Sequence, residues 1–447
     1  MHRTLWTLSL FSSVFIMNPF SLSAQKIEEV IEVAPAWAGH RVGFELKTFG
    51  DYQYVGFYDE DRRMTIGQRR LGEDAFRLVR LPEQVGWDSH NFVTLTEDDD
   101  GYVHVTGNLH GDPLIYFRTE RPRDIESFER VSEMVGKDED RMTYPRFFRG
   151  SAGELIFTYR EGGSGDGEQI YNVYDHSTRS WSRLLDQPLL SGEGRMNAYP
   201  RGPIAGPDGY FHLVWIWRDN PNAETSHTIS YARSPDLIEW ENLQGERLSL
   251  PITIETGEVV DPVPPEGGAI NGNVVLGFDS RDRVIVSYIK FDEDGKTQIY
   301  NAREEDGEWV IYQATDWNYR WFFEGRGSLN FEVRVGPVTL EDGRLTQSYS
   351  HSQEGSGVWE LDEETLRPIG DLERRSERPS GLGRPESSFP GMTVRWHPDS
   401  GDREDPDVRY WLRWETLGVN RDRRPEGDIP EPTPLRLYKV RLDADPG

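Results

Sequence analysis

The chain has 447 residues, with 50 Lys and Arg against 78 Asp and Glu, so its formal net charge is −28. This acidic excess argues against a nucleic-acid-binding protein, which needs a basic face to displace counterions. The absence of Cys excludes disulfide scaffolds, thiol enzymes and metal sites built on thiolates, whereas 14 Trp, 19 Tyr and 20 Phe argue against disorder.

Residues 1–24 have the pattern of a secretory signal peptide. His2 and Arg3 precede an apolar stretch at 5–17, and small residues lead to Ala24, after which we expect cleavage. A membrane anchor is the alternative, but the apolar stretch is shorter than the roughly 20 residues that a spanning helix needs. No later segment is apolar enough to span a membrane, and there is no Cys for a lipid anchor. We therefore expect a secreted or periplasmic protein.

Beyond residue 40, apolar and polar residues alternate as in β-strands. Three of the expected strands follow an acidic turn that ends in Gly101, Gly209 or Gly343, and such turns supply the positive φ of tight hairpins. Seven aromatic clusters recur along the chain, at 42–46, 101–105, 153–157, 209–213, 283–287, 343–346 and 409–412.

The clusters repeat every 50 to 75 residues. Tyr-rich strands follow at 169–174 and 298–302, and further strands are expected to end at Trp181, Trp240 and Trp309. A four-stranded unit that recurs at this spacing is typical of a β-propeller blade. We predict an all-β protein, with residues 25–447 forming a single seven-bladed β-propeller of four-stranded antiparallel blades. Two β-sandwiches are the alternative, although no linker divides the chain.

Two of the ten histidines, His90 and His110, are candidates for chemistry. They are twenty residues apart, with one expected strand between them, so a hairpin can bring both imidazoles to the same mouth of a propeller. The alternative is a pair of structural histidines that form hydrogen bonds within loops. His104 and His212 alternate with apolar neighbours inside strands, so we expect them to be structural.

Two tyrosines and several arginines are candidates for a cleft. Tyr144 and Tyr199 each begin a Tyr-Pro-Arg tripeptide, the second of which ends in Arg201. Blade repetition alone could explain this tripeptide. Arg160 precedes a glycine-rich stretch that we expect to be a mobile loop beside a cleft, and Arg218 follows an expected strand.

Other site classes have little support. The glycine-rich stretch lacks Gly-Lys-Ser/Thr, and no serine hydrolase or zincin motif is present. Carboxylates are too abundant for a glycosidase pair to be singled out. The acidic run at 96–100 is expected to be a solvated turn, with calcium ligation as the alternative.

Taken together, the motifs resemble those of BNR-repeat propeller proteins. Within them the chain is most similar to the seven-bladed ulvan lyases (polysaccharide lyase families twenty-four and twenty-five), especially the shorter of the two. The resemblance covers roughly residues 40 to 440 and depends on the order of its segments, which lie at 88–91, 107–110, 142–147, 157–160, 197–202, 231–236 and 410–417.

The resemblance implies a lyase that cleaves the bond to a uronic acid by β-elimination. In that family a His pair, a Tyr and an Arg carry the reaction. By motif, the implied catalytic residues are His90, Tyr144 and His110, and the implied substrate-binding residues are Arg160, Tyr199, Arg201 and Arg218.

The chemistry of elimination agrees with these roles. A guanidinium on the uronate carboxylate stabilises the enolate that forms when the C5 proton leaves, and Arg160 is the candidate. We assign His90 and Tyr144 to proton transfer without ordering them. Because the chain is acidic, the cleft is expected to be a local positive island.

Partners and cofactors follow from the same resemblance. We expect an anionic polysaccharide as substrate and a monomeric protein. Relatives can carry a structural zinc held by His and Cys, but the matching stretch near His227 has no Cys, which argues against zinc; calcium stays open. An α-L-rhamnosidase-like hydrolase, a rhamnose–glucuronate lyase and a non-catalytic glycan-binding propeller remain alternatives.

Overall fold

The computed structural model describes residues 25–373, 377–402 and 405–442. Within these ranges the chain forms thirty strands and two short 3-10 helices, η1 (Ile125–Ser127) and η2 (Ala223–Thr225), and the predicted all-β class is confirmed. The predicted signal peptide at 1–24 lies outside the described residues. Neither helix in the described part of the chain is long and apolar enough to cross a membrane.

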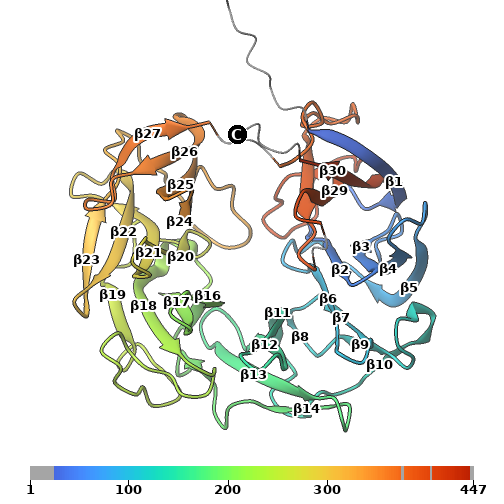
Figure 1. Ribbon diagram of the computed structural model, residues 1–447, viewed down its shortest axis with the longest axis horizontal. Helices are drawn as coiled ribbons and strands as arrows, with labels where there is room; N and C mark the ends of the chain where they lie inside the picture. The colour runs from blue at the N-terminus through green and yellow to red at the C-terminus, as the bar shows by residue number, and fades with distance from the viewer. Residues whose placement is uncertain (1–24, 374–376, 403–404, 443–447) are drawn as a thin grey trace, which may run out of the picture.

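The strands group into seven antiparallel sheets that surround a common centre in a propeller-like arrangement (Figure 1). In most sheets the strand that comes first in the chain lies nearest the centre and the fourth lies at the rim. The first three sheets contain β2 (Glu45–Phe49), β3 (Tyr52–Tyr58), β4 (Arg63–Arg70) and β5 (Arg77–Gln84); β6 (Val93–Glu97), β7 (Val103–Gly107), β9 (Tyr116–Thr119) and β10 (Phe128–Arg130); and β11 (Met142–Arg149), β12 (Leu155–Glu161), β13 (Glu168–Asp175) and β14 (Ser180–Arg183).

The other four sheets follow in chain order. They contain β16 (Asn197–Ala205), β17 (Phe211–Arg218), β18 (Ser226–Ser234) and β19 (Glu258–Asp261); β20 (Val274–Phe278), β21 (Val284–Phe291), β22 (Thr297–Glu305) and β23 (Glu308–Gln313); β24 (Val333–Glu341), β25 (Arg344–His351), β26 (Gly355–Leu361) and β27 (Pro368–Leu372); and β28 (Met392–Pro398), β29 (Val408–Leu417), β30 (Thr433–Arg441) and β1 (Lys26–Ala36).

The seventh sheet joins the two ends of the chain. Its outermost strand is β1, which pairs with β30 from Lys26 opposite Arg441 to Ala36 opposite Thr433. The N-terminal segment therefore completes the sheet that the C-terminal segment begins.

The third sheet has six strands instead of the predicted four. Two short strands from neighbouring connections extend it, β8 (His110–Asp112) and β15 (Leu190–Ser191). β8 pairs with β11, where His110 lies opposite Thr143. This extra pairing attaches the connection after β7 to the next sheet.

The predicted aromatic clusters mark the inner part of the sheets. Six of the seven fall on a second strand, and the cluster at 42–46 falls at the start of the first strand β2. All eight residues of β17 are buried, because neighbouring sheets cover both of its faces. Gly101, Gly209 and Gly343 have φ of 85°, 84° and 74°, as the turn prediction requires.

The predicted strand ends at tryptophan are wrong. Trp181 and Trp309 lie on the rim strands β14 and β23, but each is the second residue of its strand, and Trp240 lies in the connection between β18 and β19. Its side chain is only 1% exposed, and its Nε1 donates to the carbonyl of Leu237 at 3.0 Å. Asp236 accepts hydrogen bonds from the backbone of the following residues, so the segment turns and Trp240 fills the core instead of ending a strand.

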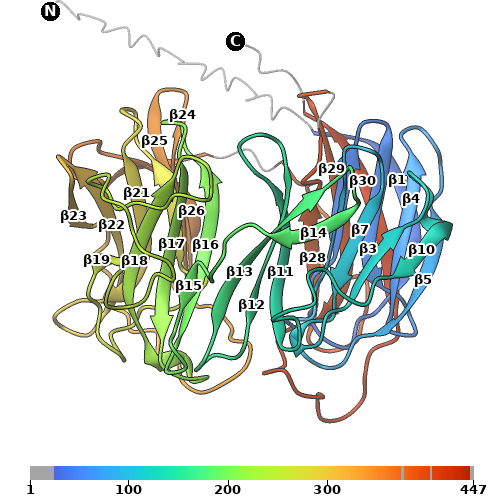
Figure 2. The same cartoon turned by 90° about the horizontal axis from the view of Figure 1, so that it is seen from below.

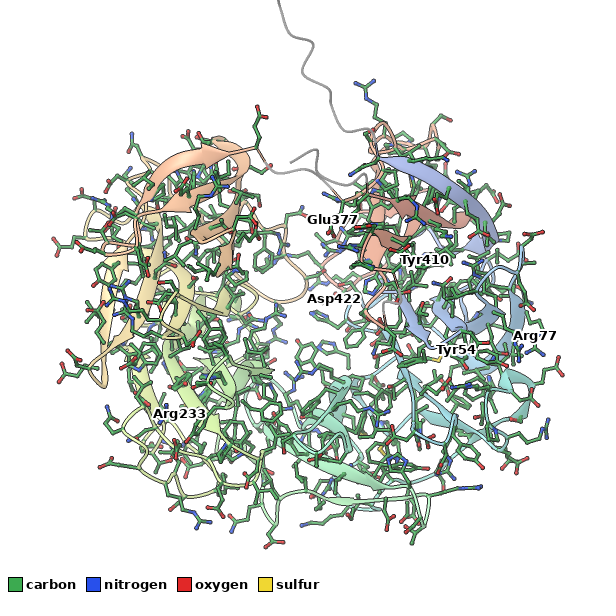
Figure 3. All side chains as sticks on the ribbon, viewed as in Figure 1. Tyr54, Arg77, Arg233, Glu377, Tyr410 and Asp422 are labelled. Carbon is green, nitrogen blue, oxygen red and sulfur yellow. The ribbon has the colours of Figure 1, made fainter. Side chains whose placement is uncertain are left out.

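Two long connections meet near the centre of the molecule. The connection between β29 and β30, red in Figure 2, projects from one end of the sheets, and Figure 3 shows its Asp422 close to the centre while Arg77 and Arg233 lie toward the rim. Asp422 accepts from the backbone N–H of Ser328, in the connection between β23 and β24, at 2.9 Å. The central cavity is therefore bordered by loops as well as by inner strands.

Candidate active site

The central cavity has a volume of about 1090 Å³ and is lined by side chains from strands of five of the seven sheets and from loops. The site residues lie where first strands begin and second strands end, because antiparallel pairing places these ends together: Thr143 lies opposite Arg160, and Asn197 opposite Arg218. All seven predicted site residues line this cavity: His90, His110, Tyr144, Arg160, Tyr199, Arg201 and Arg218.

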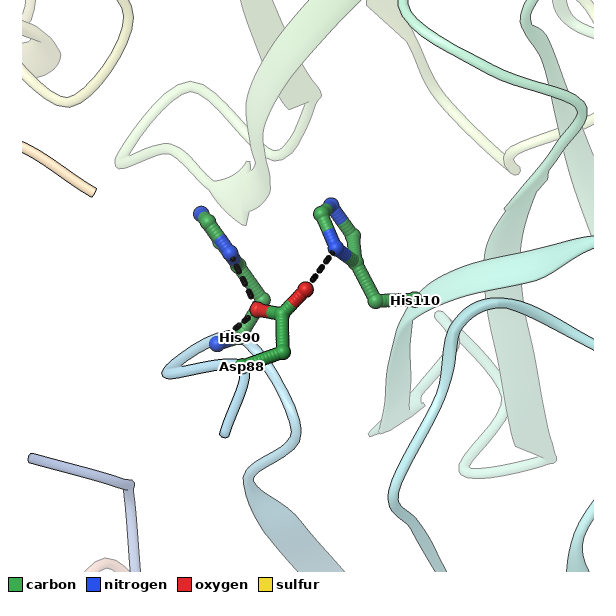
Figure 4. A group of neighbouring side chains, drawn as sticks. All are labelled: Asp88, His90 and His110. Carbon is green, nitrogen blue, oxygen red and sulfur yellow. Dashed lines mark hydrogen bonds and ion pairs between the residues drawn. The ribbon is translucent and has the colours of Figure 1, made fainter. Parts of the chain in front are cut away.

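The two histidines are joined by a carboxylate, that of Asp88 (Figure 4). His90 Nδ1 lies 2.7 Å from Asp88 Oδ1, and His110 Nδ1 lies 2.5 Å from Asp88 Oδ2. The imidazole rings are stacked, with centroids 4.3 Å apart. The sequence analysis identified both histidines as candidates but assigned no role to Asp88. The only sequence feature that could have pointed to Asp88 is its position two residues before His90.

Asp88 determines which ring nitrogens carry protons. Burial opposes its ionisation, but the hydrogen bonds from His110 and His90 hold the pKa of its carboxyl well below the usual range. An ionised carboxylate only accepts hydrogen bonds, so both Nδ1 atoms must donate to it. The Nε2 atom of each neutral imidazole is then left as an acceptor for a proton.

Tyr144 lies beside this pair in a strained backbone conformation. It falls at a bulge in the pairing of β11 with β12 and has a φ of 57°, a combination that re-aims a side chain and is often found at functional sites. Its ring centroid lies 5.9 Å from that of His90 and 6.0 Å from that of His110. Burial raises the pKa of Tyr144 to about 12, and Tyr199 adds to this rise, so the phenol keeps its proton near neutral pH.

Arg160 is a buried cation without an anionic partner. Its side chain is near the end of β12 and the residue is only 4% exposed. Nη2 donates to Thr143 Oγ1 at 3.1 Å, whereas Nε and Nη1 have no partner. The guanidinium carbon lies 5.0 Å from the ring centroid of Tyr144. No described carboxylate pairs with Arg160, which suits a guanidinium that receives an anionic ligand.

Tyr199 differs from Tyr144 in its surroundings. Arg218 Nη1 donates to its hydroxyl at 3.2 Å, and the hydroxyl donates to Ser164 Oγ at 2.8 Å. Burial alone opposes ionisation, but the charges of Arg218 and Arg160 outweigh it and lower the pKa of Tyr199. The site therefore holds two tyrosines whose pKa values are shifted in opposite directions, and their ring centroids are 6.3 Å apart.

The cavity is strongly cationic although the chain carries a net charge of −28. Only Glu45, Asp88 and Asp422 contribute carboxylates to its lining. The sequence had pointed to three of the arginines in the lining, Arg160, Arg201 and Arg218. In all, ten arginines line the cavity: Arg41, Arg141, Arg146, Arg160, Arg201, Arg218, Arg326, Arg334, Arg421 and Arg423.

His104 and His212 are structural, as the sequence analysis expected. Both are buried in second strands. His104 contacts the Tyr116 hydroxyl and Asp98, and His212 makes the same contacts with Tyr231 and Asp208. The Asp98 carboxylate is thereby engaged within its own turn, in the segment for which calcium ligation was the alternative.

Within the described residues, one group could hold a metal ion: Asp88, His90 and His110, whose ligand atoms lie within 4.8 Å of one another. Both Nδ1 atoms are engaged with the Asp88 carboxylate, so the Nε2 atom of each ring is the nitrogen left for a cation or a proton. His227, near which the sequence argued against zinc, contacts Asp219 and Thr228.

The chain is similar to known proteins in sequence and in fold. It is 27% identical over 203 residues to the short isoform of ulvan lyase from Alteromonas sp. (strain LOR), a match that covers 41% of this chain and 33% of that relative. The crystal structure of polysaccharide lyase Uly1 aligns with a TM-score of 0.63 and 16% identity, covering 94% of this chain and 100% of that one.

A second solved structure is a PL25 ulvan lyase bound to -[GlcA(1-4)Rha3S]-, with a TM-score of 0.56 and 14% identity over 92% of this chain and 96% of that one. These alignments establish a shared fold. Residues 52–317 match the family described as "BNR repeat-containing family member". Since this match spans more than half of the sequence, the chain belongs to the BNR repeat-containing family.

Proposed function

We propose that this protein is a polysaccharide lyase that cleaves uronic-acid-containing, ulvan-like polysaccharide by β-elimination and leaves 4,5-unsaturated uronate ends. The observation that carries the proposal concerns Arg160. Its buried guanidinium donates to Thr143 on β11, lies beside Tyr144 and has no partner among the described carboxylates. A uronate carboxylate is the ligand that such a group stabilises most.

The reaction follows from the positions of the neighbouring side chains. Arg160 binds the uronate carboxylate and stabilises the enolate-like charge that develops on it. His90 Nε2 removes the C5 proton; the electron pair of that C–H bond forms the C4–C5 double bond, and the C4–O4 bond breaks. Tyr144, whose pKa is raised to about 12, donates its proton to the departing O4.

The remaining site residues bind the substrate or orient the catalytic side chains. His110 shares Asp88 with His90 and fixes the position of the imidazole pair. Tyr199 and Arg218, linked at 3.2 Å, line the side of the cavity next to Arg160, and Arg201 extends this cationic wall.

The curated relatives support the substrate class. The relatives that match are ulvan lyases, although the match covers only 33% of the length of the first. The ligand of the PL25 structure contains a glucuronate linked to a sulfated rhamnose. A cavity lined by ten arginines and three carboxylates suits a polymer that carries both carboxylate and sulfate groups.

We further propose that the seven sheets are seven blades of one propeller, that residues 1–24 are a cleaved signal peptide of a secreted or periplasmic protein, and that the protein is a monomer. Mass spectrometry of the exported protein tests whether residues 1–24 are removed. The molecular mass of the protein in solution tests whether it is a monomer.

A single assay tests the activity. The purified protein is incubated with ulvan and with other uronate-containing polysaccharides, and the ultraviolet absorbance of unsaturated uronate is followed. We expect absorbance to rise with ulvan for the wild type and for the surface variant Arg344→Ala, and Arg160→Ala to lower the rate at least about a hundredfold. New reducing ends without absorbance would indicate a hydrolase, and binding without either product a non-catalytic propeller.

A further inference from the structure

A second group of arginines lies in and next to the cavity, apart from Arg160. Arg201 lies on β16, Arg334 on β24 and Arg395 on β28, and Arg41 lies in the segment before β2. All but Arg395 line the cavity. Figure 1 shows that β24 and the sheet of β29 and β30 lie across the centre from β11 and β12. Arg334 therefore comes from a strand across the centre from the site of elimination, whereas Arg201 on β16 continues the cationic wall beside Arg160.

These four guanidinium groups have no anionic partner. Elsewhere in the cavity Arg141 forms a two-point ion pair with Asp166, at 2.9 and 3.0 Å. No described carboxylate pairs with any of the four. The Nε atom of Arg395 is buried without a hydrogen-bond partner.

The four side chains are close enough to repel one another. Burial lowers the pKa of Arg395 to about 10, and the charges of Arg41 and Arg334 contribute. Burial also lowers the pKa of Arg334, with contributions from Arg41 and Arg201. Uncompensated positive charges at one place cost free energy unless an anion binds there.

The packing around the group holds its cations in place. The guanidinium carbon of Arg334 lies 4.2 Å from the ring centroid of Phe331. The same ring lies next to Gly272, where an added Cβ would approach Phe331 to 3.1 Å and Arg201 Nη2 to 3.6 Å. Gly272 has a φ of +93° and leaves room for Phe331 and Arg201 to lie side by side.

We propose that Arg41, Arg201 and Arg334, with the positive charge of Arg395 next to them, form a second anion subsite that binds a sulfate ester of the polysaccharide while a uronate of the same chain occupies Arg160. A carboxylate is planar and is matched by one bidentate arginine. A sulfate ester presents three oxygens in a tetrahedral arrangement, which suits guanidinium groups that arrive from several separate strands. This inference rests on the proposed function, because it takes the uronate at Arg160 as given.

Two polymers separate the two subsites without any turnover. Dextran sulfate carries sulfate and no carboxylate, and polygalacturonate carries carboxylate and no sulfate. We expect Arg334→Gln to weaken binding of dextran sulfate at least about tenfold and to leave polygalacturonate binding unchanged, and Arg160→Ala to do the reverse. Arg344→Gln, on the neighbouring strand β25, is the control for lost charge.

The result decides the inference independently of the lyase assay. The inference is overturned if the wild type and Arg334→Gln bind dextran sulfate equally well. It is also overturned if the wild type does not bind dextran sulfate, even where ulvan is cleaved. Selective loss supports it even where no polymer is cleaved. If thermal unfolding shows that Arg334→Gln does not fold, Arg41→Gln replaces it, and we expect the same loss of dextran sulfate binding.

Discussion

Asp88 links the chemistry of the two histidines to a single carboxylate. Because both of its oxygens accept from an Nδ1 atom, at 2.7 and 2.5 Å, the two rings are held in the tautomer that leaves Nε2 free. Asp88 is therefore a positioning residue. It acts on the substrate through His90 and His110.

Replacing Asp88 by Asn tests this role. The amide can accept from one imidazole, but its NH₂ group faces the Nδ1 of the other and reverses that tautomer. We expect kcat on ulvan to fall at least about a hundredfold with little change in KM, and the pH profile of kcat to change shape. Asp175→Asn, at the exposed end of β13, is the control. An Asp88→Asn variant with wild-type kcat and pH profile would remove Asp88 from the mechanism.

Chelation distinguishes proton transfer from metal binding at the same three residues. We expect dialysis against EDTA to leave the activity of the wild type unchanged, because the free Nε2 atoms serve as proton acceptors in the proposed reaction. Loss of activity that one added cation restores would instead assign Asp88, His90 and His110 to a metal site.

The two tyrosines make a further comparison possible. Tyr144 lies beside the two histidines and its pKa, raised to about 12, keeps it protonated, whereas the pKa of Tyr199 is lowered. Its position therefore makes Tyr144 the candidate proton donor. We expect Tyr144→Phe to lower kcat at least about a hundredfold, and Tyr199→Phe to act mainly on KM. Tyr210→Phe, at a half-buried position after the turn at Gly209 and outside the cavity lining, is the control. A larger loss of kcat in Tyr199→Phe would exchange the roles of the two residues.

Sequence reasoning found the reactive residue types but not their neighbours. His90, His110 and the Tyr-Pro-Arg tripeptides are rare enough in this acidic chain to be singled out. Asp88 is one of 78 acidic residues, and Arg41, Arg334 and Arg395 are far apart in sequence. Only the arrangement of the sheets around a common centre brings these side chains together.

At the scale of the element, strand ends determine where the site lies. Pairing of β11 with β12 puts Tyr144 and Arg160 at the same end of a sheet, and the bulge after Thr143 turns Tyr144 toward the histidines. The sequence could predict the inner strands, because burial on both faces gives continuous apolar and aromatic runs. β8 and β15 have three and two residues, too few for any periodicity, and could not be predicted.

The strand β1 was also missed, because its partner β30 lies at the other end of the chain. Its importance can be tested with two neighbouring residues on opposite faces: Ile31 is 5% exposed and Val30 is 51% exposed. We expect Ile31→Asp to lower the free energy of unfolding by at least about 2 kcal/mol, because it buries an unpaired charge, and Val30→Asp to change it little. Chemical denaturation measures both, and equal effects would show that β1 does not hold the sheet through its buried face.

At the scale of the whole molecule, charge is distributed unevenly. The chain carries −28 overall, whereas the cavity is lined by ten arginines and three carboxylates. Composition predicted the acidic surface, and the proposed chemistry required a positive cleft. The number of arginines in that cleft depends on the order of the sheets around the centre and could not be obtained from composition.

This distribution predicts how salt affects the reaction. Raising the ionic strength from about 0.01 M to about 0.1 M shortens the Debye length from about 30 Å to about 10 Å. Repulsion between the acidic surface and an anionic polymer acts over the longer distance, whereas contacts of Arg160 with a carboxylate act at hydrogen-bonding distance and are screened less. We therefore expect kcat/KM on ulvan to rise across this range while kcat stays constant. A steady fall in kcat/KM would mean that the arginine-lined cavity dominates the field that the polymer meets at long range, and that the acidic exterior does not hinder its approach.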